Sequence, residues 1–345
     1  MKIDNELKLD FHNVLIRPKR STLQSRSEVN LEREIKFKWS TLTWKGVPII
    51  AANMDTVGTF EVYDILSTFN IITAFHKFYE PEDFTRFKEK RGSTFNPNLF
   101  AISTGIGNES IEKLKNIKIE FNIICIDIAN GYISSLVDFC KQVRELFPEK
   151  IIIAGNVVTR EIVEELILNG KVDIVKVGIG PGSACTTRVK TGVGMPQLSA
   201  IIECADAAHG VDGRIIGDGG ITCPGDMAKA FGGGADFVMV GGSFAGHEEN
   251  PGEVIELEGK KYKEFYGMSS KRAMVKHYGE MNSYRSSEGR HIKIPFKGKL
   301  SDTVSDFLGG IRSTCTYINA KSIKEISKCT TFVQVSQQVN AVFVS

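Results

Sequence analysis

The chain has 345 residues, of which 42% are hydrophobic and 24% are charged, so it is long enough to bury a large core. Its 43 Lys and Arg residues nearly balance its 41 Asp and Glu residues, and the formal net charge of +2 does not indicate an extended polyanion as partner. The sequence contains no basic helix or interleaved aromatic patch of the kind that binds nucleic acid. Any recognition of phosphate is therefore expected to be local.

The sequence also bears on the compartment of the protein. Residues 1–10 alternate charged and apolar side chains, and no apolar run reaches the roughly 20 residues that a membrane-spanning helix needs. The seven cysteines are scattered and never form a CxxC motif, which argues against a disulfide framework and against zinc. We therefore expect a cytoplasmic protein with reduced thiols and no membrane partner.

Short β-branched apolar runs alternate with helix-sized segments along the first 240 residues. Most runs are nearly continuous, which is typical of parallel strands covered on both faces. The eight predicted strands are residues 47–53, 69–75, 99–103, 121–127, 151–156, 173–178, 214–218 and 236–240. Eight such units predict a closed (β/α)8, or TIM, barrel forming a single domain over residues 1–345. A doubly wound open sheet is the alternative, but it would need fewer strands or a second domain.

Two of the predicted helices carry terminal signals. Residues 157–169 have apolar side chains at helical spacing and stop at Gly170, which is expected to cap the C-terminus. Residues 224–232 begin with a proline, which suits the first helical position. Residues 1–46 before the barrel, and the flap and tail at 246–345 after it, are expected to form lids and subunit contacts.

The C-terminal ends of barrel strands carry the chemistry in this fold, so polar residues that follow each apolar run are candidates. These residues are Asn53 to Asp55, His76 and Lys77, Ser103 to Gly105, Asp127, Gly155 and Asn156, and Asp218 to Gly220. Each one alone could simply cap a helix or satisfy loop backbone. Their shared position on one rim favours a functional site.

The loop after the sixth strand, residues 178–188, is the most informative segment. Its glycines allow positive φ angles and leave backbone groups uncovered, so that the loop could bind an anion or a cation. Cys185 lies among the hydroxyls of Ser183 and Thr187 and next to Arg188 in this loop, a setting that can activate a thiol. We interpret Cys185 as a nucleophile. The alternative is an incidental cysteine, and no histidine is near in sequence.

Two further glycine clusters follow strands seven and eight, at residues 217–220 and 241–243. Barrels often bind phosphate at these loops, because glycines let backbone N–H groups approach the phosphate oxygens. Asp218 would repel a phosphate and is expected to accept hydrogen bonds from sugar hydroxyls instead. Its alternative role is to cap a helix. The rim therefore predicts a phosphorylated substrate.

Residues 178–200, with Cys185, Thr186, Thr187 and Arg188 at their centre, resemble the GMP reductases of the IMP dehydrogenase/GMP reductase family. Further segments that resemble this family are residues 15–21, 51–58, 127–132, 155–158 and 265–270. The resemblance implies reductive deamination of GMP by NADPH to IMP and ammonia, in purine salvage. It also implies a thioimidate between a cysteine and purine C2, and a homotetramer.

The resemblance assigns roles residue by residue. Cys185 matches the nucleophile, Thr187 and Glu288 match the pair that protonates the leaving ammonia, and Lys77 matches a rim lysine near cofactor and substrate. The implied GMP contacts are Ser183, Asp218, Gly219, Gly220, Gly241, Gly242, Met268, Ser269, Arg285 and Ser287. The expected NADPH residues are Lys77, Thr104, Asp127, Ser270, Tyr284 and Arg290. The 2′-phosphate role of Arg290 is our own assignment and is not implied by the resemblance. The implied K⁺ ligands are the backbone carbonyls of Gly180, Gly182 and Cys185.

Two other functions are compatible with the pattern. IMP dehydrogenases usually carry a pair of regulatory modules after the second strand, whereas only residues 77–97 separate strands two and three here. A catalytically silent nucleotide-binding protein would keep the glycine clusters without the chemistry, but Cys185, Thr187 and Glu288 are all present. The sequence departs from the family pattern at Ala184, Met195, residues 221–223 and Arg290, and the last of these bears on cofactor preference.

Overall fold

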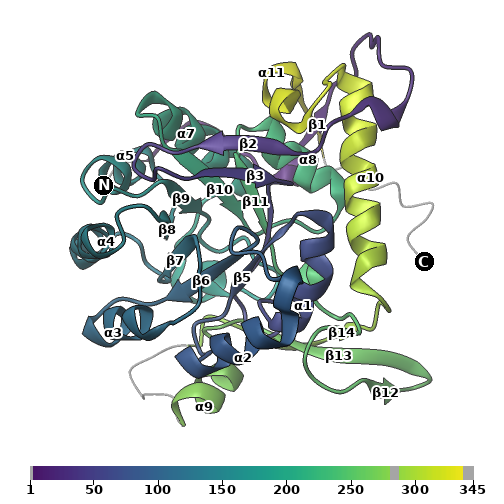
Figure 1. The fold of residues 1–345 in the computed structure, drawn as a ribbon. Coiled ribbons are helices and arrows are strands. Elements are labelled where there is room, and N and C mark those ends of the chain that lie inside the picture. The colour runs from purple at the N-terminus through teal and green to yellow at the C-terminus, as the bar shows by residue number, and fades with distance from the viewer. Residues whose placement is uncertain (1–2, 280–286, 337–345) are drawn as a thin grey trace.

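A computed structural model describes residues 3–279 and 287–336, and its centre is a closed barrel of eight parallel strands (Figure 1). The barrel strands are β4 (Ile49–Ala51), β5 (Ile72–Phe75), β6 (Phe100–Thr104), β7 (Ile123–Asp127), β8 (Ile151–Val157), β9 (Ile174–Val177), β10 (Arg214–Asp218) and β11 (Phe237–Val240). The sheet closes where β11 pairs with β4. All eight predicted strands and the predicted TIM barrel are confirmed, and the open-sheet alternative is wrong.

Helices surround the barrel (Figure 1). They are α1 (Phe60–Leu66), α2 (Pro81–Arg91), α3 (Asn108–Asn116), α4 (Ser134–Leu146), α5 (Arg160–Leu168), α7 (Gln197–Gly210), α8 (Pro224–Gly232) and α10 (Leu300–Ile318). Helix α10 packs against both α8 and α1 and thereby completes the ring. The segment expected to be a tail therefore supplies the eighth helix of the barrel.

The helix ends follow local geometry. Helix α8 has the predicted bounds, with Pro224 in its first turn. Helix α5 ends at Leu168, and the left-handed residue beyond it is Lys171 rather than the predicted cap Gly170. Gly170 is required for another reason, since a Cβ there would lie 2.7 Å from the Leu166 carbonyl oxygen.

The barrel has two apolar cores, one inside the barrel and one between the strands and the helices. Alternate strand residues such as Ile50, Ile123 and Ile216 fill its interior, and their neighbours pack outward against the helices. The hairpin of β2 (Arg33–Lys36) and β3 (Thr43–Gly46) closes the N-terminal end, where Trp44 packs against Phe237 with ring centroids 5.0 Å apart. The opposite, C-terminal end is left for a site.

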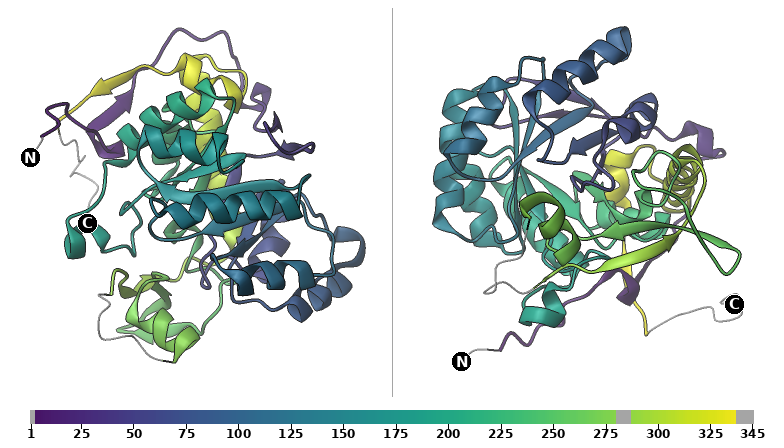
Figure 2. Two further views of the ribbon diagram at one scale, coloured as in Figure 1. Left: turned by 90° about the vertical axis from the view of Figure 1, so that its left-hand side faces the viewer. Right: turned by 90° about the horizontal axis from the view of Figure 1, so that it is seen from below.

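Segments from both ends of the chain cover the barrel. Strands β12 (Ile255–Leu257), β13 (Lys260–Tyr266) and β14 (His291–Pro295) form an antiparallel sheet, which lies with α9 (Lys271–Tyr278) across one end of the barrel (Figure 2). Strand β1 (Val14–Ile16) pairs with β15 (Phe332–Gln334) near the C-terminus, beside α11 (Ile326–Cys329). Short 3₁₀ helices lie at Phe11–Asn13, Arg26–Glu28, Ser67–Phe69, Gly92–Thr94, Gly242–Phe244 and Ile323–Glu325. Within the described ranges, no helix is long and apolar enough to span a membrane.

Candidate active site

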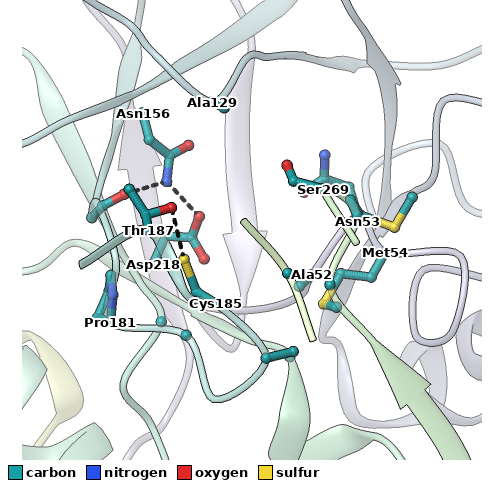
Figure 3. A pocket seen from close by; sticks show the side chains of 18 of the residues that line it. Ala52, Asn53, Met54, Ala129, Asn156, Pro181, Cys185, Thr187, Asp218 and Ser269 are labelled. Atoms are coloured by element: carbon teal, nitrogen blue, oxygen red, sulfur yellow. Dashed lines mark hydrogen bonds between the residues drawn. The ribbon is translucent and has the colours of Figure 1, made fainter. Parts of the chain in front are cut away.

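A cavity of about 520 Å³ opens at the C-terminal ends of the barrel strands. Its walls come from the strand ends, from the loop after β9, from the segment between β13 and α9, and from Glu288 and Gly289. Its size is that of a site for one small molecule. Figure 3 shows Cys185, Thr187, Asn156 and Asp218 on one side of it, with Asn53, Met54 and Ser269 on the other.

Three of the four predicted catalytic residues, Cys185, Thr187 and Glu288, are connected by hydrogen bonds in this cavity. The Cys185 thiol lies 3.2 Å from the Thr187 hydroxyl, and that hydroxyl donates to a Glu288 carboxylate oxygen at 2.7 Å (Figure 3 draws the first contact). The route can carry a proton between sulfur and carboxylate through the hydroxyl. Cys185 is half-buried and lines the cavity, so its thiol can reach a bound ligand.

A two-stranded pairing brings Glu288 to Thr187 across 101 residues of sequence. Cys185 and Gly289 form an antiparallel bridge, and the Thr186 amide donates to the Glu288 carbonyl at 2.8 Å. Gly289 must be glycine, because a Cβ there would lie 2.8 Å from the Ser270 backbone nitrogen. These contacts fix the position of the 287–290 segment relative to the cysteine loop.

Arg290 reinforces this pairing. Its backbone amide donates to the Ala184 carbonyl at 2.9 Å, and its guanidinium donates twice to the Ser183 carbonyl, at 3.0 and 2.7 Å. The predicted role of Arg290 is contact with the 2′-phosphate of the cofactor. In this structure the side chain fastens the cysteine loop and remains exposed to solvent.

The predicted phosphate and ribose residues gather in the same cavity. Gly219 and Gly220 have φ angles of +92° and +80°, which favour glycine and turn their backbone toward the cavity lining. A Cβ on Gly242 would lie 2.5 Å from the Ser183 hydroxyl, so glycine keeps this corner open. Gly241 lines the same corner. The four glycines therefore expose backbone groups where an anion could bind.

The floor of the cavity carries one lysine and two carboxylates, and the sequence predicted only the carboxylates. Lys176 projects from β9 between two carboxylates, 2.5 Å from Asp127 and 3.1 Å from Asp218. Asn156 donates to the same Asp218 oxygen at 2.8 Å, so Asp218 is no helix cap, and Cys223 precedes α8 instead. Lys176 lies inside a predicted apolar strand, where the periodicity gives no sign that its side chain faces the site.

The remaining predicted residues divide between the cavity and its supports. Lys77, Met268 and Ser269 line the cavity. Thr104 and Ser270 are buried beside it, and the Ser270 hydroxyl caps α9 by accepting from the Ala273 amide. The Ser287 hydroxyl accepts from the Lys271 amide and donates to the Gly289 carbonyl, which ties the segment down. Tyr284 and Arg285 lie outside the described residues.

A second group of charged residues, centred on Asp55, was not predicted from the sequence. One carboxylate oxygen of Asp55 accepts from the Tyr266 hydroxyl at 2.9 Å, from Lys276 at 2.9 Å and from His277 at 2.6 Å. Burial opposes ionisation of Asp55, but these donors outweigh it and lower its pKa. The cluster fixes α9 to the loop after β4. No local signal could reveal it, because the partners are more than 200 residues apart.

The backbone of the cysteine loop is the candidate cation site. The Gly182 carbonyl accepts from the Cys185 amide at 2.9 Å, which curls the loop, and a carbonyl oxygen keeps a second lone pair for a ligand. Gly180 has a φ of +86° and lines the same cavity. Among the described residues, no three His, Cys, Asp or Glu side chains are grouped as a metal site. The backbone carbonyls of this loop therefore stay the predicted ligands for a weakly hydrated cation.

The fold and the site together define a (β/α)8-barrel protein whose candidate active site is centred on a cysteine at the C-terminal rim. The chain belongs to the IMP dehydrogenase/GMP reductase family, because residues 8–341 match the model of the "IMP dehydrogenase / GMP reductase domain". It is 57% identical over 346 residues to "GMP reductase" of Klebsiella pneumoniae, covering 99% of both chains. It is 58% identical over 347 residues to human "GMP reductase 2", covering 99% of this chain and 98% of the relative.

Proposed function

We propose that the protein is a GMP reductase, which converts GMP to IMP and ammonia at the expense of NADPH and serves purine salvage. The observation that carries the proposal is the contact chain from Cys185 through Thr187 to Glu288 inside the cavity. Relatives named for this activity, matching over nearly the whole chain, support it independently.

In the proposed mechanism, a proton moves in both directions along the hydrogen bonds that join Cys185, Thr187 and Glu288. The Cys185 thiol gives its proton through Thr187 to Glu288, and the thiolate adds to C2 of the purine, which becomes tetrahedral. Glu288 then returns that proton through Thr187 to the C2 amine, so that the C–N bond breaks and ammonia leaves. The product of this half-reaction is a thioimidate on Cys185. NADPH, when bound, supplies the hydride that C2 accepts before the C–S bond breaks and IMP is released.

We further propose how the nucleotide and the cofactor are held. The backbone at Gly219, Gly220, Gly241 and Gly242 with Ser183 would bind the phosphate, and the Asp218 carboxylate would accept from ribose hydroxyls. Met268, Ser269, Ser287 and Arg285 would complete the GMP site. Lys77, Thr104, Asp127, Ser270, Tyr284 and Arg290 would serve NADPH. The carbonyls of Gly180, Gly182 and Cys185 would hold K⁺.

The test is the absorbance of NADPH with purified protein and GMP, run beside a converse assay with IMP and NAD⁺. We expect NADPH consumption with ammonia release, and we expect Cys185→Ala to abolish turnover while GMP still binds. NADH formation from IMP without GMP activity would mean a dehydrogenase. GMP binding without turnover in either assay would mean a silent nucleotide-binding protein.

We also propose a cytoplasmic homotetramer in which residues 1–345 form one domain. Light scattering of the purified protein tests the assembly, and a monomer mass would contradict it. Exposed apolar side chains on and after α6 (Thr187–Thr191), namely Val189 and Val193, offer surface for a subunit contact.

A further inference from the structure

Lys176 is a lysine enclosed in the barrel under the cavity. Its side chain is 3% exposed, and the nitrogen donates to Asp127 at 2.5 Å and to Asp218 at 3.1 Å. Room for it comes from Gly155 on the neighbouring strand, where a Cβ would lie 2.6 Å from the Lys176 Cβ. A cation at this depth needs its partners, because an unpaired buried charge is very costly.

The two carboxylates that Lys176 joins come from different sides of the proposed site. Asp127 ends β7 and is proposed for the cofactor, whereas Asp218 ends β10 and is proposed for the ribose. Both line the cavity. The same Asp218 oxygen, Oδ2, accepts from Asn156 (Figure 3) and from Lys176. These two donors fix the carboxylate and leave Oδ1 for a ligand.

We propose that Lys176 is a positioning residue, which keeps the Asp127 and Asp218 pair ionised and aims Asp218 at the sugar hydroxyls of the bound nucleotide. The inference rests on the proposed function for the identity of that ligand. The ligand touches Asp218, and Lys176 acts through it. Without the cation, the Asp127 and Asp218 carboxylates would lie near each other with no positive charge between them, and their mutual repulsion would favour the uptake of one proton.

The groups that surround Lys176 agree with this role. Burial opposes its charge, yet Asp127 and Asp218 outweigh burial and raise the pKa of Lys176. Burial likewise opposes ionisation of Asp127, but Lys176 and then Lys77 lower its pKa. The Cys125 thiol on β7 also faces this group, and burial raises its pKa to about 12, so it stays neutral. Lys176 is thus the cation that both carboxylates share.

The experiment measures GMP binding by calorimetry from pH 5.5 to 8 for the wild type, for Lys176→Met, and for Asp127→Asn with and without Lys176→Met. The wild-type profile includes the second ionisation of the GMP phosphate, at about pH 6, and is the reference for every variant. Lys176→Met should bind GMP roughly 10- to 100-fold more weakly, because a charged hydrogen bond is lost. The loss should grow as the pH falls, and Asp127→Asn in the same chain should restore part of the affinity by removing the repulsion.

Lys263→Met is the matched control. Lys263 is also buried, but its nitrogen donates to the backbone carbonyls of Glu248 and Asn250, away from the two carboxylates. We expect this variant to lose stability without any pH-dependent change in GMP affinity. Wild-type affinity and an unchanged, wild-type pH profile in Lys176→Met would overturn the inference, as would a similar pH-dependent loss in the control.

Two readouts keep the test decisive. If Lys176→Met does not fold, the double variant is compared with Asp127→Asn alone, and equal GMP affinities would contradict a role for Lys176. Infrared difference spectra of the ligand-free proteins report a protonated carboxyl directly. If the wild type failed to bind GMP, the proposed function would fall, whereas absence of a protonated carboxyl in Lys176→Met at neutral pH would overturn the charge-holding role itself.

Discussion

At the scale of single residues, the hydrogen bond from Thr187 to Glu288 predicts the route by which the Cys185 proton moves. Thr187→Val or Glu288→Gln removes one member of the route, and we expect kcat with GMP and NADPH to fall by roughly 10²- to 10⁴-fold. GMP affinity should change little, because neither group is proposed to bind the nucleotide. Stopped-flow assays and calorimetry measure the two quantities.

The neighbouring Thr186 provides the control for that prediction. Its hydroxyl donates only a long bond, 3.4 Å, to the Ser287 carbonyl. Thr186→Val should therefore keep kcat within a few-fold of the wild type. Equal losses in Thr186→Val and Thr187→Val would show that the loop tolerates no change, and the proton route would lose its support.

Arg290 is a second residue whose role can be decided by kinetics. Its guanidinium donates to the Ser183 carbonyl in the structure, whereas we propose that it contacts the 2′-phosphate of NADPH. We expect Arg290→Gln to raise KM for NADPH roughly tenfold or more without raising KM for NADH, because a charged contact to phosphate is lost. Arg272→Gln, an exposed arginine on α9, is the control. An equal fall in kcat with both cofactors and unchanged KM would instead assign Arg290 to loop positioning.

At the scale of elements, α10 and α8 approach closely through one glycine of an adjacent pair. A Cβ at Gly310 would lie 2.3 Å from the Cβ of Pro224 on α8, whereas a Cβ at Gly309 meets no atom within 4 Å. We expect Gly310→Ala to destabilise the protein by about 1–3 kcal/mol through overpacking. Gly309→Ala should stabilise it by about 0.5–1 kcal/mol, because alanine favours a helix. Denaturant unfolding measures both, and equal shifts would contradict the packing.

At the scale of the whole molecule, the buried His76 links folding to pH. Burial lowers the pKa of His76 from 6.5 to about 4, so the unfolded chain takes up its proton at a higher pH than the folded chain. The stability that the neutral ring provides is complete above pH 6.5 and is lost as the pH falls toward 4. The loss from this one group amounts to about 3 kcal/mol.

His76→Asn should remove that part of the pH dependence. The asparagine oxygen can still accept from the Phe78 amide, as the His76 ring nitrogen does at 3.3 Å. Denaturant unfolding at pH 7 and at pH 5 measures the difference. A slope as steep in His76→Asn as in the wild type would mean that other groups cause the acid sensitivity.

The site was predictable where its residues share a short stretch of sequence. Cys185, Thr187 and the glycine clusters lie in loops that follow strands, and the barrel brings all such loops to one rim. Glu288 was identified by resemblance alone, because its pairing with the cysteine loop spans 101 residues. Lys176 and the Asp55 cluster were missed, since neither strand periodicity nor local motif reports which distant side chains meet.

The sequence by itself determined the eight strands, the closed barrel and the cysteine loop, because near-continuous β-branched runs and glycine-rich turns act locally. Only the tertiary structure decided that the C-terminal segment contributes the eighth barrel helix, that Arg290 fastens the cysteine loop, and that Lys176 joins Asp127 to Asp218. Those features depend on hydrogen bonds, charges and close packing between residues far apart in the chain. Such contacts exist only once the barrel has closed.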